Sequence, residues 1–324
     1  MNVLVTGGAG FLGGYVMAAL ERSGHAALAY DIAPPGEETR AVSPTIVSRF
    51  RYGQIDDVAR LLDVCRNENI EAIIHAAGMV GLELSLEQPA ATYRTNVMGL
   101  VNVCEVARQL RMRRVVFISS NAAYHRGSGE ILAETDPVFS IRDGNPAAHY
   151  GTSKMAAEAI GLAYASFQEL DFLSLRITAV YGFGMRSPMY IKPMVENAVL
   201  GRPTRFATGG RMKRDYTHVL DCADGILAAL IAQRWTAGEQ RVINIASGRA
   251  RTAGEVAGMV RHAVPGAEIE IADALTPLEE ENLKMRASLD VSAAKRLLNW
   301  SPKWQLEEGI SEYAETFRQY VLRP

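Results

Sequence analysis

Val3-Leu4-Val5-Thr6-Gly7-Gly8-Ala9-Gly10-Phe11-Leu12-Gly13 is the stretch that decides the fold. Its apolar first half predicts a buried strand, which runs directly into glycines that open a segment of helical period. Glycines at positions 8, 10 and 13 let the backbone turn sharply, approach a pyrophosphate and pack helix against strand. The stretch therefore predicts a dinucleotide-binding turn, with a tight turn that holds no ligand as the alternative.

Asp31 follows the next apolar run, residues 26–30. A carboxylate at this place accepts hydrogen bonds from the hydroxyls of an adenosine ribose, and it would repel a 2′-phosphate. The next residues, Ile32-Ala33-Pro34, supply no arginine that would attract such a phosphate. We therefore expect NAD rather than NADP as the cofactor, with a solvated turn aspartate as the alternative.

Short β-branched runs alternate along the chain with longer segments of helical period. This pattern predicts an α/β fold, a doubly wound parallel Rossmann sheet with a smaller C-terminal α/β substrate lobe. The expected strands are residues 2–6, 26–30, 46–52, 71–76, 114–119, 172–179 and 242–246, and the expected helices are residues 10–23, 56–67, 89–110 and 149–169.

Glycine and proline become frequent after residue 182, as in Gly201-Arg202-Pro203, which predicts a loop-rich lobe that closes a substrate pocket. We expect an NAD-binding Rossmann domain over residues 1–182 and a substrate-binding lobe over residues 183–324. The strand near residues 242–246 is expected to return to the main sheet.

Composition excludes several classes of partner. The net charge is −2, and the 34 Lys and Arg residues are spread along the chain, so we expect no nucleic-acid or membrane partner. The first residues show no export signal, and the three cysteines lie far apart in helical patterns, which favours a cytoplasmic protein with buried thiols. The six histidines are scattered, so no metal site is expected, and His75 is interpreted as a core residue.

Tyr150 and Lys154 lie four residues apart at the start of a predicted helix and therefore share one face. A phenol of pKa ~10 is a poor base at neutral pH, but a nearby ammonium and a positive nicotinamide ring would stabilise the phenolate. Tyr150 would then take the proton from a substrate hydroxyl as hydride leaves the same carbon, and Lys154 would hold the nicotinamide ribose. The alternative is a pair of surface neighbours.

Ser119 and Ser120 end a buried apolar run at the expected carboxyl edge of the sheet, where ligands bind in such folds. Ser120 would hydrogen-bond the reacting oxygen and align it with Tyr150. Turn or capping chemistry is the alternative for this serine.

With these motifs the chain resembles, over nearly its whole length, the extended short-chain dehydrogenase/reductase superfamily, in its NAD-dependent epimerase/dehydratase group. The further stretches that carry the resemblance are His75-Ala76-Ala77-Gly78, Asn96-Val97-x-Gly99, Arg176 with Val180-Tyr181-Gly182, Arg214-Asp215-Tyr216-x-His218-Val219-x-Asp221, and Leu289-Asp290 through Trp300-Ser301-Pro302 to Glu308-Gly309-Ile310.

The resemblance implies Ser120, Tyr150 and Lys154 as catalytic residues and a homodimer formed through helices 89–110 and 149–169. It also implies that Asn96 supports the active-site helix and that Val180 flanks the nicotinamide. The residues expected to bind the cofactor are Gly7, Gly10, Phe11, Leu12, Gly13, Asp31, Gln54, Ile55, Ala76, Ala77, Gly78, Asn96, Ser119, Tyr150, Lys154 and Val180.

The chain departs from the family pattern at three places, one at the cofactor and two at the substrate. Gln54 stands where an aspartate usually holds the adenine, and Ala179 stands where nucleotide-sugar epimerases typically have asparagine. Residues 277–282 are acidic where the family has Arg-Pro-Gly-Asp, which speaks against a nucleotide diphosphate and slightly favours a smaller substrate. The cations that remain candidates for anion binding are Arg186, Lys192, Arg205, Arg211, Lys213 and Arg214.

The predicted function is an NAD-dependent epimerase or oxidoreductase acting on a hydroxyl of a small-molecule sugar or sugar-like substrate, with a nucleotide sugar left open. Dehydration is not expected, because Ser120-Asn121-Ala122 lacks the acid that dehydratases carry. One alternative is a simple NAD-dependent sugar or polyol dehydrogenase. The other is a non-catalytic dinucleotide-sensing protein, against which the retained Ser120, Tyr150 and Lys154 argue.

Overall fold

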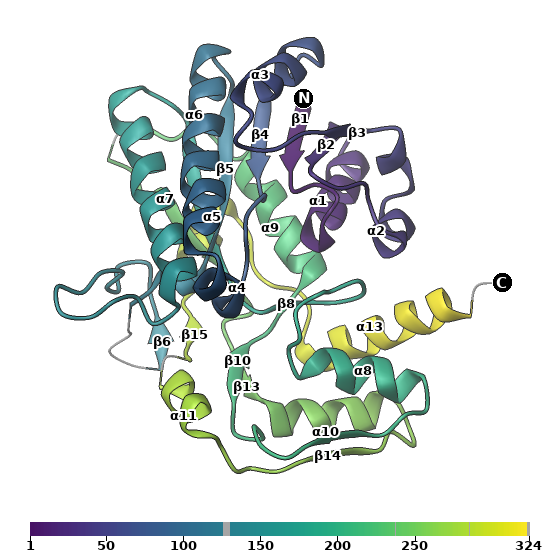
Figure 1. Ribbon diagram of the computed structural model, residues 1–324. Helices are drawn as coiled ribbons and strands as arrows, with labels where there is room; N and C mark the ends of the chain where they lie inside the picture. Colours follow the sequence, from purple (N-terminus) through teal and green to yellow (C-terminus); the bar gives the residue numbers. More distant parts are fainter. Residues whose placement is uncertain (126–129, 237, 285, 323–324) are drawn as a thin grey trace.

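A seven-stranded parallel sheet forms the centre of the computed structural model (Figure 1), which describes residues 1–125, 130–236, 238–284 and 286–322. The strand order is β12-β7-β5-β4-β1-β2-β3, so the order reverses between β1 and β4. The expectation of a doubly wound parallel sheet is therefore confirmed. The strands are β1 (Asn2–Thr6), β2 (Ala26–Asp31), β3 (Phe50–Tyr52), β4 (Ala72–His75), β5 (Arg114–Ser120), β7 (Phe172–Ile177) and β12 (Val242–Ile245).

Both faces of the sheet are buried, because successive strand residues point to opposite sides. In β1, Val3 and Val5 join one apolar cluster and Leu4 joins the other. One face is covered by α1 (Phe11–Arg22), α9 (Val219–Ile231) and α12 (Ser292–Leu298), and the other by α3 (Val58–Asn67), α6 (Gly99–Gln109) and α7 (Ala148–Phe167).

Two expected elements differ in the structure. The strand expected over residues 46–52 was wrong in its first half, because Pro44 starts a 3-10 turn, Pro44–Val47, that buries Ile46, and β3 begins only at Phe50. The helix expected over residues 89–110 is divided into α5 (Pro89–Tyr93), a π-helical segment (Arg94–Met98) and α6. Such wide turns are frequent at functional sites.

The lobe has an apolar core of its own, so the expectation of a loop-rich region was only partly right. Three helices form that core: α8 (Ile191–Val199), α10 (Ala253–Ala263) and α13 (Leu306–Val321). Figure 1 shows them beyond the carboxyl ends of the central strands. The short strand pairs that join them are β8 (Val180–Tyr181) with β11 (Thr217–His218), β9 (Thr204–Phe206) with β14 (Ile269–Ile271), β10 (Lys213–Asp215) with β13 (Ala250–Thr252), and β6 (Ile131–Leu132) with β15 (Ser288–Leu289).

Two carboxylates of the 214–221 motif fasten the lobe to the sheet. Asp215 accepts hydrogen bonds from the backbone N–H of Gly248 at 3.1 Å and of Leu289 at 2.9 Å. Asp221 accepts from the backbone N–H of Lys303 at 2.9 Å and of Trp304 at 3.0 Å. Both therefore satisfy backbone donors of segments far along the chain, which is a structural role.

Two general expectations can be compared with the fold. All three cysteines are buried free thiols, in α3, α6 and α9, as expected. In the part of the chain that the structure describes, none of the helices has the length and apolar character needed to cross a membrane.

Candidate active site

The glycine turn between β1 and α1 forms a backbone cradle that only glycine permits. Gly7 has φ 70°, and a β-carbon there would stand 2.8 Å from the Ala77 nitrogen. A β-carbon on Gly13 would stand 2.2 Å from the Gly7 oxygen. Helix α1 then starts after Gly10 without a side-chain cap, so its first N–H groups remain available to a pyrophosphate. The cradle therefore fits a dinucleotide.

Asp31 is held by this turn at the end of β2. Its carboxylate accepts the Ala9 N–H at 3.1 Å and the Ile32 N–H at 2.7 Å. Burial raises the pKa of Asp31, while these backbone bonds and the more distant Arg186 lower it. The tertiary structure thus brings an arginine of the lobe near a position where the local sequence offers none.

The segment that follows β3 is fastened by side chains of neighbouring elements. The Gln54 side chain is exposed, and its backbone oxygen accepts the Tyr30 hydroxyl at 3.0 Å. Ile55 is buried, and its backbone oxygen accepts the Asn102 amide at 3.0 Å. Both residues therefore come shortly after Tyr52, which pairs with Asp31 at the expected cofactor edge.

Asn96 lies in the π-helical segment and connects three parts of the site. Its amide nitrogen donates to the Met79 oxygen at 3.0 Å and to the Ser153 hydroxyl at 2.9 Å, and its Oδ1 accepts the Met79 N–H at 2.8 Å. Ser153 in turn donates to the backbone oxygen of Tyr150 at 2.7 Å. These contacts go to protein groups, so Asn96 supports both α7 and the loop that contains Ala76, Ala77 and Gly78.

Ser120, Tyr150 and Lys154 are brought together by β5 and α7. The buried Lys154 ammonium donates to the Ile118 oxygen at 2.8 Å and lies 4.8 Å from the centre of the Phe117 ring. The Ser120 hydroxyl lies close enough to the Tyr150 phenol to lower its pKa. The Ser120 oxygen also accepts the Ala122 N–H at 3.1 Å, so the serine caps a turn as well. The structure therefore collects the three residues at the carboxyl end of β5.

The electrostatics of the chain by itself keep Tyr150 protonated. Burial raises the pKa of Tyr150, and the nearby Ser120 hydroxyl opposes this as the weaker effect. Burial lowers the pKa of Lys154 to about 8, against an opposing effect of Glu158. We expected the Lys154 ammonium to stabilise the phenolate, but it is not among the groups that shift the Tyr150 pKa here. That stabilisation is therefore left to the positive nicotinamide ring of a bound cofactor.

His75 lies in the core, as expected. Its ring is fully buried, its Nδ1 lies 2.7 Å from the Thr6 hydroxyl, and it stacks on Phe117 at 5.7 Å. Burial, followed by the Lys154 charge, lowers the pKa of His75 to about 3, so the ring is neutral. Across residues 1–125, 130–236, 238–284 and 286–322, no group of three or more His, Cys, Asp or Glu side chains is arranged to hold a metal ion.

Arg214 and Arg286 form a cationic cluster beside Tyr216 in the lobe. Both guanidinium groups are close enough to lower the Tyr216 pKa, although burial raises it to about 12. Burial, followed by Arg214, lowers the pKa of Arg286 to about 9. Within the described residues, the buried Arg286 Nε and Tyr216 Oη have no hydrogen-bond partner, and neither arginine forms an ion pair. The cluster therefore has the donors of an anion site and no anion from the chain.

Arg286 is a residue that the sequence analysis missed. The acidic stretch before it, residues 277–282, belongs to the short helix α11 (Pro277–Leu283). Glu279 caps this helix with Thr276 and accepts the Tyr190 hydroxyl at 2.7 Å. Because Glu279 is engaged in this way, the stretch is a poor argument against an anionic substrate. The signal that was available is Arg286 itself, a cation shortly before Leu289-Asp290.

Ala179 and Val180 continue the chain from β7 toward the lobe. Ala179 has φ 36°, the left-handed region that asparagine tolerates better than alanine, and this kink ends β7 at Ile177. Val180 starts β8 and pairs in register with Thr217.

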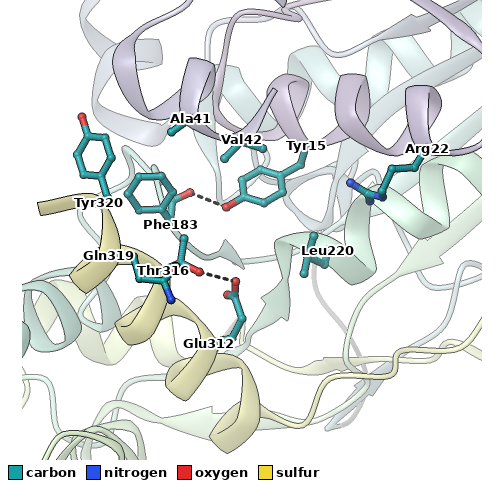
Figure 2. Close-up of a pocket in the computed structure, with 10 residues that line it drawn as sticks. All are labelled: Tyr15, Arg22, Ala41, Val42, Phe183, Leu220, Glu312, Thr316, Gln319 and Tyr320. Atoms are coloured by element: carbon teal, nitrogen blue, oxygen red, sulfur yellow. Dashed lines mark hydrogen bonds between the residues drawn. The ribbon is translucent and has the colours of Figure 1, made fainter. Parts of the chain in front are cut away.

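A separate cavity of about 230 Å³ lies between α1, α2 (Glu37–Val42), α9 and α13 (Figure 2). In it the Tyr15 hydroxyl donates to the Phe183 oxygen at 3.0 Å, and Thr316 donates to Glu312 at 2.8 Å. The residues expected to bind cofactor or substrate do not line this cavity. It is therefore a gap at the junction of the C-terminal helix with the sheet layer.

Comparisons with known proteins agree with this geometry. The profile of the NAD dependent epimerase/dehydratase family matches residues 3–246. A UDP-glucose 4-epimerase of Mycolicibacterium smegmatis is 29% identical, covering 98% of this chain and 99% of that protein. A UDP-glucuronate 4-epimerase of Thermodesulfobacterium geofontis is 27% identical, covering 95% and 93%. The solved structure of MoeE5 in complex with UDP-glucose and NAD is 28% identical with a TM-score of 0.81, covering 99% of this chain and 100% of that one.

Proposed function

The chain belongs to the NAD-dependent epimerase/dehydratase family, and from this premise we propose that it epimerises a hydroxyl-bearing carbon of a nucleoside-diphosphate sugar. The membership makes it an NAD-dependent enzyme of this family. The substrate class is our inference from the lobe.

The observation that supports this substrate class is the cluster of Arg214 and Arg286. The two like charges repel each other, and no ion pair among the described residues compensates for this, so the cluster lowers the stability of the folded chain. A bound diphosphate would offset that cost through charge-assisted hydrogen bonds. The similar UDP-glucose 4-epimerase of M. smegmatis and the MoeE5 complex with UDP-glucose support the same class. The local sequence favours a smaller substrate, because it does not show that Arg286 comes close to Arg214.

In the proposed mechanism Tyr150 takes the proton from the sugar hydroxyl and later returns a proton to the same oxygen. Ser120 hydrogen-bonds that oxygen and keeps it in line with the phenol. Lys154 holds the nicotinamide ribose, and Gly7, Gly13 and their turn hold the pyrophosphate. The chemistry that NAD supplies when bound is reversible acceptance of hydride from the sugar carbon.

We also propose a cytoplasmic homodimer, with residues 1–182 as the cofactor part and residues 183–324 as the substrate lobe. The three buried thiols fit a reducing compartment. The dimer would form through α5, the π-helical segment, α6 and α7, where Met98 is 50% exposed and Phe167 is 81% exposed. Light scattering tests the dimer, and a monomeric mass would refute it.

The decisive experiment incubates the purified protein with NAD and UDP-glucose, UDP-glucuronate or the corresponding free sugars, and follows both epimer formation and NADH absorbance. We expect epimers of a nucleotide sugar without net NADH, and no reaction of the free sugars. Replacement of Tyr150 by Phe should lower the rate by about 10²–10⁴-fold, because the base is lost.

Two results would contradict the proposal. Accumulation of NADH with free sugars would identify a simple sugar dehydrogenase. A Tyr150→Phe protein with unchanged function would instead support a non-catalytic dinucleotide sensor.

A further inference from the structure

Asn145 lies between the two elements that carry Ser120 and Tyr150. Its amide nitrogen donates to the backbone oxygens of Ala122 at 3.1 Å and Ala123 at 3.4 Å, in the turn that follows Ser120. Its Oδ1 accepts the Ala147 N–H at 2.7 Å, just before α7. The Asn145 side chain thus connects two elements. Its N–H group donates to the turn of residues 121–123 after Ser120 (the serine turn), and its oxygen accepts at the start of α7, which carries Tyr150 (the tyrosine helix).

Gly151 allows this contact to be direct. A β-carbon at Gly151 would stand 2.1 Å from the Asn145 Oδ1 and 2.4 Å from the Ala122 oxygen. Gly151 is buried and follows Tyr150 immediately. Because no side chain fits at this point, the helix backbone, the Asn145 amide and the serine turn pack against one another without a spacer.

The start of α7 also depends on Asn145. The helix has no side-chain cap, and its first residue, Ala148, has φ 50°. The Ala148 N–H donates to the Asn145 backbone oxygen at 2.8 Å, and the Gly151 N–H donates to the Ala147 oxygen at 3.0 Å. The turn that Asn145 closes therefore determines where α7 begins, and so where Tyr150 lies relative to Ser120.

We propose that Asn145 is a positioning residue that sets the separation between the Ser120 hydroxyl and the Tyr150 phenol. This inference rests on the catalytic roles given to those two side chains in the proposed function. A second tie between the same elements, from Lys154 to the Ile118 oxygen at 2.8 Å, lies one turn further along α7. Two ties one turn apart fix the orientation of the helix as well as its distance, so the Lys154 tie alone does not replace Asn145.

The test compares Asn145→Ala and Asn145→Asp with Asn2→Ala as a matched control. Asn2 also donates its amide to two successive backbone oxygens, those of Glu68 at 3.3 Å and Asn69 at 3.1 Å, but at the amino end of β1. Asn145→Asp keeps the size and the acceptor, and loses only the donor to the serine turn. Each protein is loaded with NAD, and its melting temperature, NAD affinity and single-turnover hydride transfer from the reacting nucleotide sugar are measured.

We expect both Asn145 variants to slow hydride transfer by about 10- to 100-fold, because an ångström of misplacement is enough for such a loss. KM and NAD affinity should stay within about twofold, and Asn2→Ala should leave the rate within about twofold. A folded Asn145→Ala protein with a rate like that of Asn2→Ala would overturn the proposal. If Asn145→Ala does not fold, the same criterion applies to Asn145→Asp.

A second readout does not need a known substrate. The Tyr150 phenol is titrated by its absorbance in the NAD-loaded protein, as the difference from Tyr150→Phe. The nearby Ser120 hydroxyl lowers the Tyr150 pKa, so moving it away in Asn145→Ala should raise that pKa. An unchanged titration would overturn the positioning role. If no nucleotide sugar reacts with the wild-type protein, the proposed function fails, and this titration still decides the role of Asn145.

Discussion

Arginines have different partners in the two halves of the molecule, buried ones in the sheet and half-buried ones in the lobe. In the sheet, Arg114 pairs with Asp171 at 2.6 Å and Arg176 pairs with Glu158 at 2.7 Å, all of them at most 5% exposed. In the lobe, Arg214 lies close enough to Arg286 to lower its pKa, and neither arginine forms an ion pair among the described residues. The two sheet arginines stabilise the fold through their carboxylate partners. The two lobe arginines leave positive charge that an external anion can neutralise.

Removing a guanidinium group from water costs free energy, and the two halves of the molecule compensate for this cost differently. A buried guanidinium that is satisfied by its own chain holds elements together, as Arg114 does by also donating to the last carbonyl oxygens of α9. A guanidinium that the chain leaves unpaired weakens the fold and strengthens ligand binding. The Lys154 ammonium resembles the second kind, because among the described residues its hydrogen bond runs to the neutral Ile118 oxygen and not to a carboxylate.

The largest effect should come from breaking the structural pair. Arg114→Ala should lower the free energy of unfolding by about 3–5 kcal/mol, because it leaves the Asp171 carboxylate buried with less compensation. Urea unfolding measures this change. The control is Arg318→Ala, which removes an exposed pair with Glu315 and should cost at most about 0.5 kcal/mol. Similar losses of unfolding free energy in Arg114→Ala and Arg318→Ala would show that the buried pair is no more important for stability than the exposed one.

Lys154 should behave in the opposite way. Its folded pKa of about 8 lies below the ordinary 10.5, so folding disfavours the ammonium, and the wild-type free energy of unfolding should rise as pH increases from about 8 to 10.5. Lys154→Met should remove this rise and gain up to about 3 kcal/mol at pH 7, while activity is lost. Urea unfolding at pH 7 and about pH 10 tests it. A less stable variant whose free energy still rises with pH would contradict this assignment.

Arg286→Ala should separate binding from stability. The Michaelis constant for a nucleotide sugar should rise by about 10- to 100-fold, since one charge-assisted contact to the diphosphate is lost. The free energy of unfolding should stay the same or increase, because an unpaired buried cation is removed. Arg205→Ala, which removes an exposed arginine at 69% side-chain accessibility, is the control. Loss of stability without a change in the Michaelis constant would make Arg286 a structural residue.

The smallest effect concerns the backbone between the two halves. In the sheet half Asn299 occupies the left-handed region at φ 51°, whereas Ala179, at the entrance to the lobe, is held there at φ 36°. Ala179→Asn should therefore raise the free energy of unfolding by less than about 1 kcal/mol. Thermal unfolding measures it, and a lower melting temperature would show that Ala179 is not strained.

How far the sequence could predict the site depended on how local each contact is. Gly7, Gly13 and Asp31 lie within one strand–helix–strand unit, so their spacing was enough to bring them together in the prediction. Ser120 and Tyr150 required only knowledge of which edge of the sheet carries ligands. The division of the helix around Asn96 was missed, because a π turn has no distinct pattern of apolar residues.

By itself the sequence determined the doubly wound sheet, the cofactor turn and the identity of the residues around Tyr150, because periodicity and glycine spacing act through the local backbone. Only the tertiary structure decided that Arg286 comes close to Arg214, that Asn145 joins the turn after Ser120 to the start of α7, and that Glu279 accepts the Tyr190 hydroxyl. These arrangements depend on how separate segments pack, and the free energy of that packing is shared among residues too far apart in the chain for any local pattern to record it.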